Sequence, residues 1–167
     1  MALLIIVVAT AAPSLGNFFR GRSLDSEARR LLSLTRQGQD RAVSEGVPMT
    51  LWIDAPQRIY GLEEESSYTE QDTKAVDFTL DRDLRIEVVT INSSNKVSTA
   101  TTSRTFSSNT LSGSKHGNLP MIRFLPDGFV DGTSPRAVGL FDRDGATLWL
   151  TRSTNGLNYE IRNQINQ

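Results

Sequence analysis

Cysteine is absent from this chain of 167 residues, and histidine occurs once, at His116. Without cysteine there is no disulfide framework, no thiolate nucleophile and no cysteine-based zinc site. The single histidine lies in the polar stretch SGSKHGN, where a solvated side chain is expected more often than a catalytic one. A dominant charge is lacking too, because 18 Lys and Arg residues face 19 Asp and Glu residues. No overall basic field therefore favours nucleic acid as a partner.

Known catalytic motifs are missing as well. The chain contains no G-x-S-x-G, no H-E-x-x-H and no phosphate-binding glycine loop. The stretch FDRDGA places Asp142 and Asp144 as in the opening of a calcium-binding loop, but hydrophobic residues follow where an EF-hand needs further ligands. Asp127 and Asp131 could join them only if two turns met in space. A hairpin turn is the better interpretation, and we expect no enzyme, no metal and no cofactor.

The chain opens with the apolar run MALLIIVVATAAPSLGNFFRGR. A secretory signal would begin with basic residues, and here the arginines come only after the run. Crossing a bilayer takes about 20 helical residues, and Pro13, Ser14, Gly16 and Asn17 dilute the second half of this segment. The run is therefore expected to be neither a signal peptide nor a complete membrane span.

The next stretch has the spacing of an amphipathic helix. Apolar residues recur at i, i+3 and i+4, and we expect four of them to pack the helix on a sheet: Leu24, Ala28, Leu31 and Leu32. The opposite face carries arginines, including Arg41, that we expect to be solvated. Gly46 and Pro48 predict a helix end near Glu45. Because the pattern resumes after Pro13, the sequence predicts one kinked helix of roughly 40 residues whose first half protrudes.

Beyond the helix the hydrophobic period changes to two, which is typical of strands. Met49, Leu51 and Ile53 share one face of a predicted strand, and LRIEVVTI gives a second. Pro-Asp-Gly, Asp-Gly and Asn-Gly turns between later apolar runs predict an antiparallel meander. The acidic run EEESSYTEQDTK is expected to form a solvated, uncompensated loop. Residues 92–118 are expected to form a surface loop with at most one weak edge strand.

One known architecture combines an apolar opening, an overlong helix and an all-β remainder. The segment from Leu3 to Asp54 resembles the GspH/FimT group of type IV pilin-like pseudopilins, in which an apolar helix with a midway proline enters a Ser-Glu-Ala-rich amphipathic half. IRFLPDG and LWLTRSTNGLNYEI are similar to late strands of that group. The matching helix residues are Leu3, Leu4, Ile5, Ile6, Val7 and Val8 in the membrane and assembly segment, Pro13 at the kink, and Ser26, Glu27, Ala28, Leu31 and Leu32 in the lower half.

The resemblance implies an α+β fold, with a long kinked N-terminal helix packed on an antiparallel β-rich globular domain of two small sheets. It divides the chain into two parts. Residues 1–22 would form an apolar membrane and filament-core half-helix. Residues 23–167 would form a pilin-like globular domain, with its amphipathic helix over residues 23–45 and its strands over residues 48–167.

The resemblance also implies a structural role. The chain would be a minor pseudopilin or minor pilin, anchored in the bacterial inner membrane by a single helix, with its globular domain in the periplasm or outside the cell. It would assemble into a type II secretion pseudopilus or a type IV pilus, near the tip. Its partners would be other pseudopilins or pilins, the inner-membrane assembly platform and lipid around the N-terminal helix.

Family precursors carry a basic leader that ends in glycine, followed by an apolar start with an early glutamate. This chain starts inside the apolar segment, and its first acidic residue is Asp25. We therefore expect a leader and the first helical turns to lie upstream of Met1, which leaves leader cleavage and N-methylation open. The alternative function is a DNA-binding minor pilin for DNA uptake. Its candidate contacts are the arginine face of the helix or the basic loop residues Lys96, Arg104 and Lys115. A membrane-anchored enzyme is a further rival.

The helix register can be tested at Leu31. Leu31→Arg would bury a charge against the sheet and should strongly destabilise the globular domain, because an unpaired buried charge costs several kcal/mol. The measurement is the thermal unfolding midpoint of the variant beside the parent. An unchanged midpoint would contradict the predicted packing face.

Overall fold

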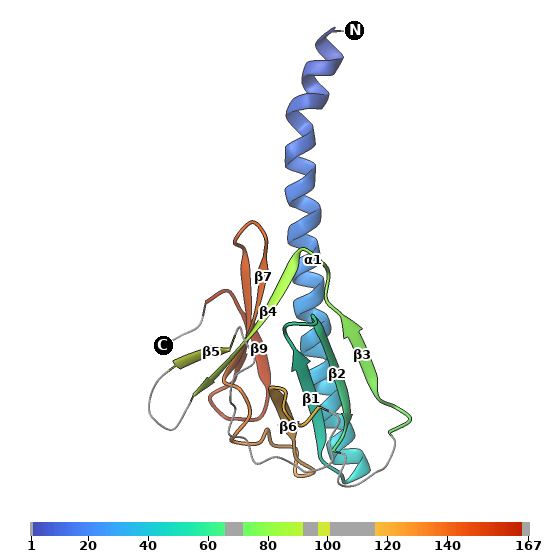
Figure 1. Ribbon diagram of the computed structural model, residues 1–167, viewed down its shortest axis with the longest axis vertical. Helices are drawn as coiled ribbons and strands as arrows, with labels where there is room; N and C mark the ends of the chain where they lie inside the picture. The colour runs from blue at the N-terminus through green and yellow to red at the C-terminus, as the bar shows by residue number, and fades with distance from the viewer. Residues whose placement is uncertain (1, 66–71, 92–96, 101–115, 165–167) are drawn as a thin grey trace.

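The first element of the computed structural model is one helix that projects beyond the rest of the molecule (Figure 1). The structure describes residues 2–65, 72–91, 97–100 and 116–164, and for residues 2–21, 91 and 97–100 it describes the backbone alone. Helix α1 (Ala2–Glu45) has 44 residues and continues through Pro13. The predicted end at Glu45 is confirmed: Gly46 takes a φ of 71°, and its N–H donates to the Ala42 carbonyl at 3.1 Å.

The rest of the described chain forms strands joined by turns and loops. The stretches predicted from period-two alternation are β1 and β4, and the turn residues separate the later strands. The bounds are β1 (Met49–Asp54), β2 (Ile59–Glu64), β3 (Val76–Thr79), β4 (Leu84–Ile91), β5 (Val97–Ala100), β6 (Met121–Phe124), β7 (Ala137–Asp142), β8 (Thr147–Arg152) and β9 (Tyr159–Arg162).

The strands form two antiparallel sheets, both packed on the lower half of α1 (Figure 1). One sheet has the order β3-β2-β1-β6 and the other has the order β5-β4-β7-β8-β9. In the first sheet Leu51 lies opposite Leu62 and Ile122, and in the second Val138 lies opposite Val88 and Leu150. The predicted α+β class, with one long helix on two small sheets, is confirmed.

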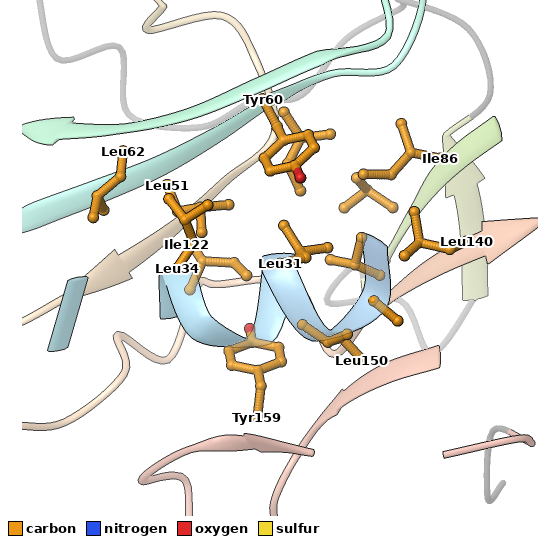
Figure 2. Close-up of a cluster of buried hydrophobic side chains, with 14 of the residues drawn as sticks. Leu31, Leu34, Leu51, Tyr60, Leu62, Ile86, Ile122, Leu140, Leu150 and Tyr159 are labelled. Atoms are coloured by element: carbon orange, nitrogen blue, oxygen red, sulfur yellow. The ribbon is translucent and has the colours of Figure 1, made fainter. Parts of the chain in front are cut away.

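The hydrophobic core lies where the helix meets the sheets (Figure 2). On the helix side Leu24, Ala28 and Leu31 are buried, and Leu32 is half-buried against the same cluster. Leu34, which is not among the predicted packing residues, is also buried there. Side chains from both sheets converge on these helix positions, and the largest fully buried ones include Leu51, Tyr60, Leu62, Ile86, Ile122, Leu140 and Leu150. Removing apolar area from water on this scale is the main stabilising contribution to the fold.

The turns predicted from glycine lie between the later strands. Gly128, Gly145 and Gly156 all have positive φ, which an L-residue with a side chain adopts at a cost. The Asp-Gly turn joins β7 to β8, and the Asn-Gly turn joins β8 to β9. Within the stretch 92–118, strand β5 forms one edge of its sheet as expected, while residues 92–96 and 101–115 lie outside the described residues.

Each sheet carries one outward tryptophan that lies over a glycine of the neighbouring strand. Trp52 pairs with Gly61, and Trp149 pairs with Gly139. A Cβ on Gly61 would lie 2.5 Å from the Trp52 ring and 2.6 Å from the Val76 carbonyl oxygen. A Cβ on Gly139 would lie 2.6 Å from the Trp149 ring. These glycines therefore allow the indole rings to lie close to the sheet surface.

The close approach at Gly61 leads to a stability prediction. Gly61→Ala would press a methyl group against the backbone of β3, so we expect a loss of about 1–3 kcal/mol in the free energy of unfolding. Gly132→Ala is the matched control, because nothing lies within 4 Å of a Cβ built there. Urea denaturation of both variants measures the difference. If Gly61→Ala and Gly132→Ala had equal free energies of unfolding, the prediction would be wrong, because β3 would then move away from the added methyl group at no cost.

Candidate functional site

The long helix is the candidate functional element, because all the predicted assembly residues lie in it. Leu3, Leu4, Ile5, Ile6, Val7, Val8 and Pro13 all lie within the half of α1 that projects beyond the sheets (Figure 1). The backbone remains helical at Pro13, and the kink expected there stays a prediction. In the part of the chain that the structure describes, no helix is both long enough and apolar enough to cross a membrane.

A buried carboxylate attaches the upper part of the packed helix to the four-stranded sheet. The Tyr60 hydroxyl donates to Glu27 Oε1 at 2.5 Å, and Arg30 donates to Glu27 Oε2 at 2.9 Å. Glu27 is only 5% exposed, so these bonds compensate for its removal from water. Burial, followed by the hydrogen bond to Glu27, raises the pKa of Tyr60 above its ordinary value. The hydroxyl therefore remains the proton donor throughout the physiological range.

A cluster of charged groups attaches the lower end of α1 to the same sheet. Arg41 donates to Asp72 at 3.1 Å and to Glu45 at 3.1 Å, and it reaches Glu64 at 3.4 Å. Lys74 adds a second cation at 2.9 Å from Glu45. The Arg41 and Asp72 side chains are only 9% and 6% exposed. This attachment therefore holds the C-terminal turn of the helix against β2 and the segment that leads to β3.

Two expectations from the sequence are wrong at this cluster. Arg41 is buried rather than solvated, because its guanidinium group points into the acidic groups of the sheet edge. The acidic run was expected to be an uncompensated loop, yet Asp72 bonds to Arg41 and Glu65 bonds to Arg123. Residues 66–71 of that run lie outside the described residues. Both errors have one cause, since the compensating charges are far away in the sequence.

The same cluster lowers the pKa of two carboxylic acids. The Arg41 and Lys74 side chains hydrogen-bond the Glu45 carboxylate and bring its pKa down to about 2. Burial opposes the ionisation of Asp72, but hydrogen bonds from Arg41 and from the backbone N–H groups of Lys74 and Glu64 outweigh it, so its pKa is lowered as well. Both groups therefore stabilise the folded state when they are ionised.

A third attachment connects the helix to loops at the base of the domain. The Gln39 side-chain amide donates to the carbonyl of Gly128 and to the carbonyl of Leu157, with distances of 2.5 and 2.8 Å. Gly128 belongs to the turn after β6, whereas Leu157 belongs to the turn between β8 and β9. One helix side chain thus joins turns that follow strands of different sheets.

The ion pairs of Arg123 brace the edge strand β6. Arg123 donates to Glu65 at 2.8 Å and to Asp131 at 3.1 Å. Burial opposes the ionisation of Asp131, but hydrogen bonds from the backbone and side chain of Thr133, followed by the Arg123 bond, outweigh it and lower its pKa. The Asp131 carboxylate is therefore already bonded to Arg123 and Thr133.

The expectation that His116 is solvated is wrong. Its ring stacks on Trp52 with centroids 3.9 Å apart and an interplanar angle of 14°. Its Nδ1 lies 3.0 Å from Glu63 Oε1, and the side chain is 19% exposed. Nothing in the local pattern SGSKHGN could reveal this, because Trp52 and Glu63 belong to strands β1 and β2, far away in the sequence. The histidine is a packing residue on the outer face of the four-stranded sheet.

The calcium-like stretch forms a hairpin, as its turn residues indicate. The Gly145 N–H donates to the Asp142 carbonyl at 3.1 Å, and the Asp142 N–H donates to the Ala146 carbonyl at 2.9 Å. Within the described ranges no group of at least three His, Cys, Asp or Glu side chains is placed to hold a metal ion. Lys96, Arg104 and Lys115, the loop candidates for DNA contact, lie outside those ranges. What the described residues do build is a rigid attachment for a projecting helix.

The Arg41 cluster predicts acid sensitivity. Because the folded pKa values of Asp72 and Glu45 are lowered, their contribution is complete above the unfolded values of 3.8 and 4.5. It is lost as the pH falls through the folded pKa values, and for Glu45 that value is about 2. Asp72→Asn should lower the free energy of unfolding at neutral pH by about 1–3 kcal/mol and make the acid decline shallower. Urea denaturation across this pH range measures both effects. Asp77→Asn, at an exposed position of β3, is the control. If the two variants had the same free energy of unfolding and the same pH dependence, the stabilising role assigned to Asp72 would be wrong.

Two solved structures share this architecture, although no protein-family model and no curated protein sequence matches the chain. Both are structures of the minor pseudopilin EpsH from the type II secretion system of Vibrio cholerae. The first has a TM-score of 0.56 at 13% identity, covering 84% of this chain and 92% of that one. The second has a TM-score of 0.57 at 14% identity, covering 83% and 94%. The chain therefore has the fold of a GspH-like minor pseudopilin.

Proposed function

We propose that this chain is a structural subunit of a pseudopilus, and specifically a minor pseudopilin of a type II secretion system placed near the filament tip. One observation carries the proposal: the lower half of α1 is packed and bonded to both sheets, while its apolar upper half projects beyond them (Figure 1). The shared fold with the Vibrio cholerae minor pseudopilin supports the same role.

The projecting half-helix would lie in two apolar environments, one after the other. It would first anchor the subunit in the inner membrane, with the sheets on the periplasmic side, and would then pack among helices of neighbouring subunits. Lipid tails and a bundle of apolar helices are similarly apolar, so the exchange costs little hydrophobic free energy and side-chain packing decides it. The partners are other pseudopilins, and the inner-membrane assembly platform would drive the transfer.

The attachments of α1 fit such a movement. A force that draws the helix into a filament has to reach the globular domain through the contacts between helix and sheets. Glu27, Gln39 and Arg41 distribute these contacts along the packed half, from the strand β2 to the turns at the base. Several separate bonds along one rigid helix would keep the globular domain at a fixed position relative to the helix as the subunit moves.

The experiment compares two substitutions in the native bacterium, expressed in a strain that lacks the gene. Val7→Asp places a charge in the apolar half-helix and should remove the subunit from the membrane fraction and from sheared filaments, because a charge in lipid costs about 2.5–3.5 kcal/mol or more. Arg36→Gln, at an exposed position of the packed half, is the control and should behave as the parent. Secretion of the system's exported enzymes is the functional measurement.

Two results would contradict this proposal. If Val7→Asp remained in the membrane and in the filaments at the parent's level, the projecting half would not be the assembly element. If deletion of the gene left both secretion and filament composition unchanged, the role as a pseudopilus subunit would be wrong.

A further inference from the structure

The base of the globular domain, at the end of α1 opposite to its projecting half, carries an apolar patch (Figure 1). Among the described side chains, the exposed large hydrophobic ones are Val43, Phe129 and Leu157, at 54%, 49% and 38%. Gln39 Nε2 donates to the carbonyls of both Gly128 and Leu157, so two turns meet beside the helix. Val43 lies one helical turn beyond Gln39, and its methyl carbon is 3.5 Å from a Cβ built on Gly128. We call Val43, Phe129 and Leu157 the Phe129 patch.

The gathering of these side chains at one place points to a binding surface. Single exposed hydrophobic residues are ordinary on a protein surface, whereas a group of them marks a site of contact. Here all the exposed large hydrophobic side chains of the described residues belong to one patch. They come from the last turns of α1, from the turn after β6 and from the turn between β8 and β9.

The backbone of the patch needs no water. The Phe129 N–H donates to Asp127 Oδ1 at 3.0 Å, and the Phe129 carbonyl accepts from the Leu125 N–H at 2.9 Å. The Leu157 N–H donates to Asn155 Oδ1 at 3.1 Å, and the Leu157 carbonyl accepts the bond from α1 given above. A partner that covers the patch therefore removes water from apolar side chains without leaving these backbone groups unpaired, and unpaired polar groups are a main cost of binding.

The position of the patch decides against lipid as its occupant. Between Leu24 and Val43 the helix extends by about 29 Å at 1.5 Å per residue. Under the proposed function the projecting half lies in the membrane, so the patch faces away from the membrane (Figure 1). Its occupant therefore has to be a protein on the far side of the domain.

A second copy of this chain does not fit that position. Among the described side chains there is no further exposed large hydrophobic group, so none of them offers an apolar surface that would receive the patch. Two patches in contact across a two-fold axis at the ends of their domains would direct the projecting helices in opposite directions. Both helices could then not be anchored in one membrane.

We propose that the Phe129 patch binds the globular domain of a different pseudopilin, which lies beyond this subunit on the side away from the membrane. The partner brings an apolar surface that covers Val43, Phe129 and Leu157. Because a neighbour covers its base, this chain is not the terminal subunit of the filament. This inference rests on the proposed function, for which it names the contact surface and the kind of partner.

Photocrosslinking in the native bacterium tests the proposal. The full chain carries the photoreactive residue p-benzoylphenylalanine in place of Phe129, in a strain that lacks the gene, and filaments are sheared from the cells after irradiation. We expect an adduct in which mass spectrometry finds this chain joined to one different pseudopilin. The same photoreactive residue in place of Asp77, at an exposed position of the edge strand β3, is the control and should not give that adduct.

A double substitution tests the contribution of the patch to assembly. Phe129→Ser with Leu157→Ser removes two apolar groups that are exposed, so the purified variant should unfold at the parent's midpoint and should remain in the membrane fraction. Its amount in sheared filaments should fall about tenfold or more, because a few apolar side chains carry most of the binding energy of an interface. Asp77→Asn is the control and should enter filaments as the parent does. Should the double variant unfold, Leu157→Ser alone replaces it.

Three results would overturn the proposal: an adduct that joins two copies of this chain, the lack of any adduct with a different pseudopilin, and incorporation of the double variant at the parent's level. Each would refute this contact alone if the Val7→Asp variant still failed to enter filaments, because the proposed function would then stand. Unchanged secretion and filament composition after deletion of the gene would instead refute the proposed function.

Discussion

Burial of one face of α1 against two sheets is the constraint on which the rest of the structure depends. Each sheet is small and has one apolar face, so neither could shield that face from water without the helix. Leu24, Ala28 and Leu31 fill the space where the two apolar faces meet. The helix is therefore an integral part of the globular domain, and its upper half extends from a firmly held base.

Polar contacts give this packing a definite register. An apolar stripe on a helix can shift along a sheet at moderate cost, because dispersion contacts are not directional. Glu27 with Tyr60, and Arg41 with Asp72, have defined partners at short distances, and a shift would leave charged groups buried without them. These contacts therefore hold α1 at one defined position on the sheets.

The fold was predictable from the sequence to a large extent, because its signals are local. The end of α1 at Glu45 follows from Gly46 and Pro48, and the later hairpins follow from their glycine turns. The apolar residues of the packed helix face follow from a spacing of three and four. The candidate site was less predictable: Arg41, Asp72 and His116 were assigned to solvent, although each is held by residues from a distant segment.

The sequence by itself determined the α+β class, the long helix with its buried face, and the resemblance to pilin-like subunits. These depend on periodicity and turn residues, which act between neighbours along the chain. Only the tertiary structure decided which charges are buried, which tryptophan is covered and where exposed apolar residues gather. Those features depend on strand order and register, which place His116 on Trp52 and bring the turns of Gly128 and Leu157 to the side chain of Gln39. Their physical cause is burial between distant segments, which no local pattern records.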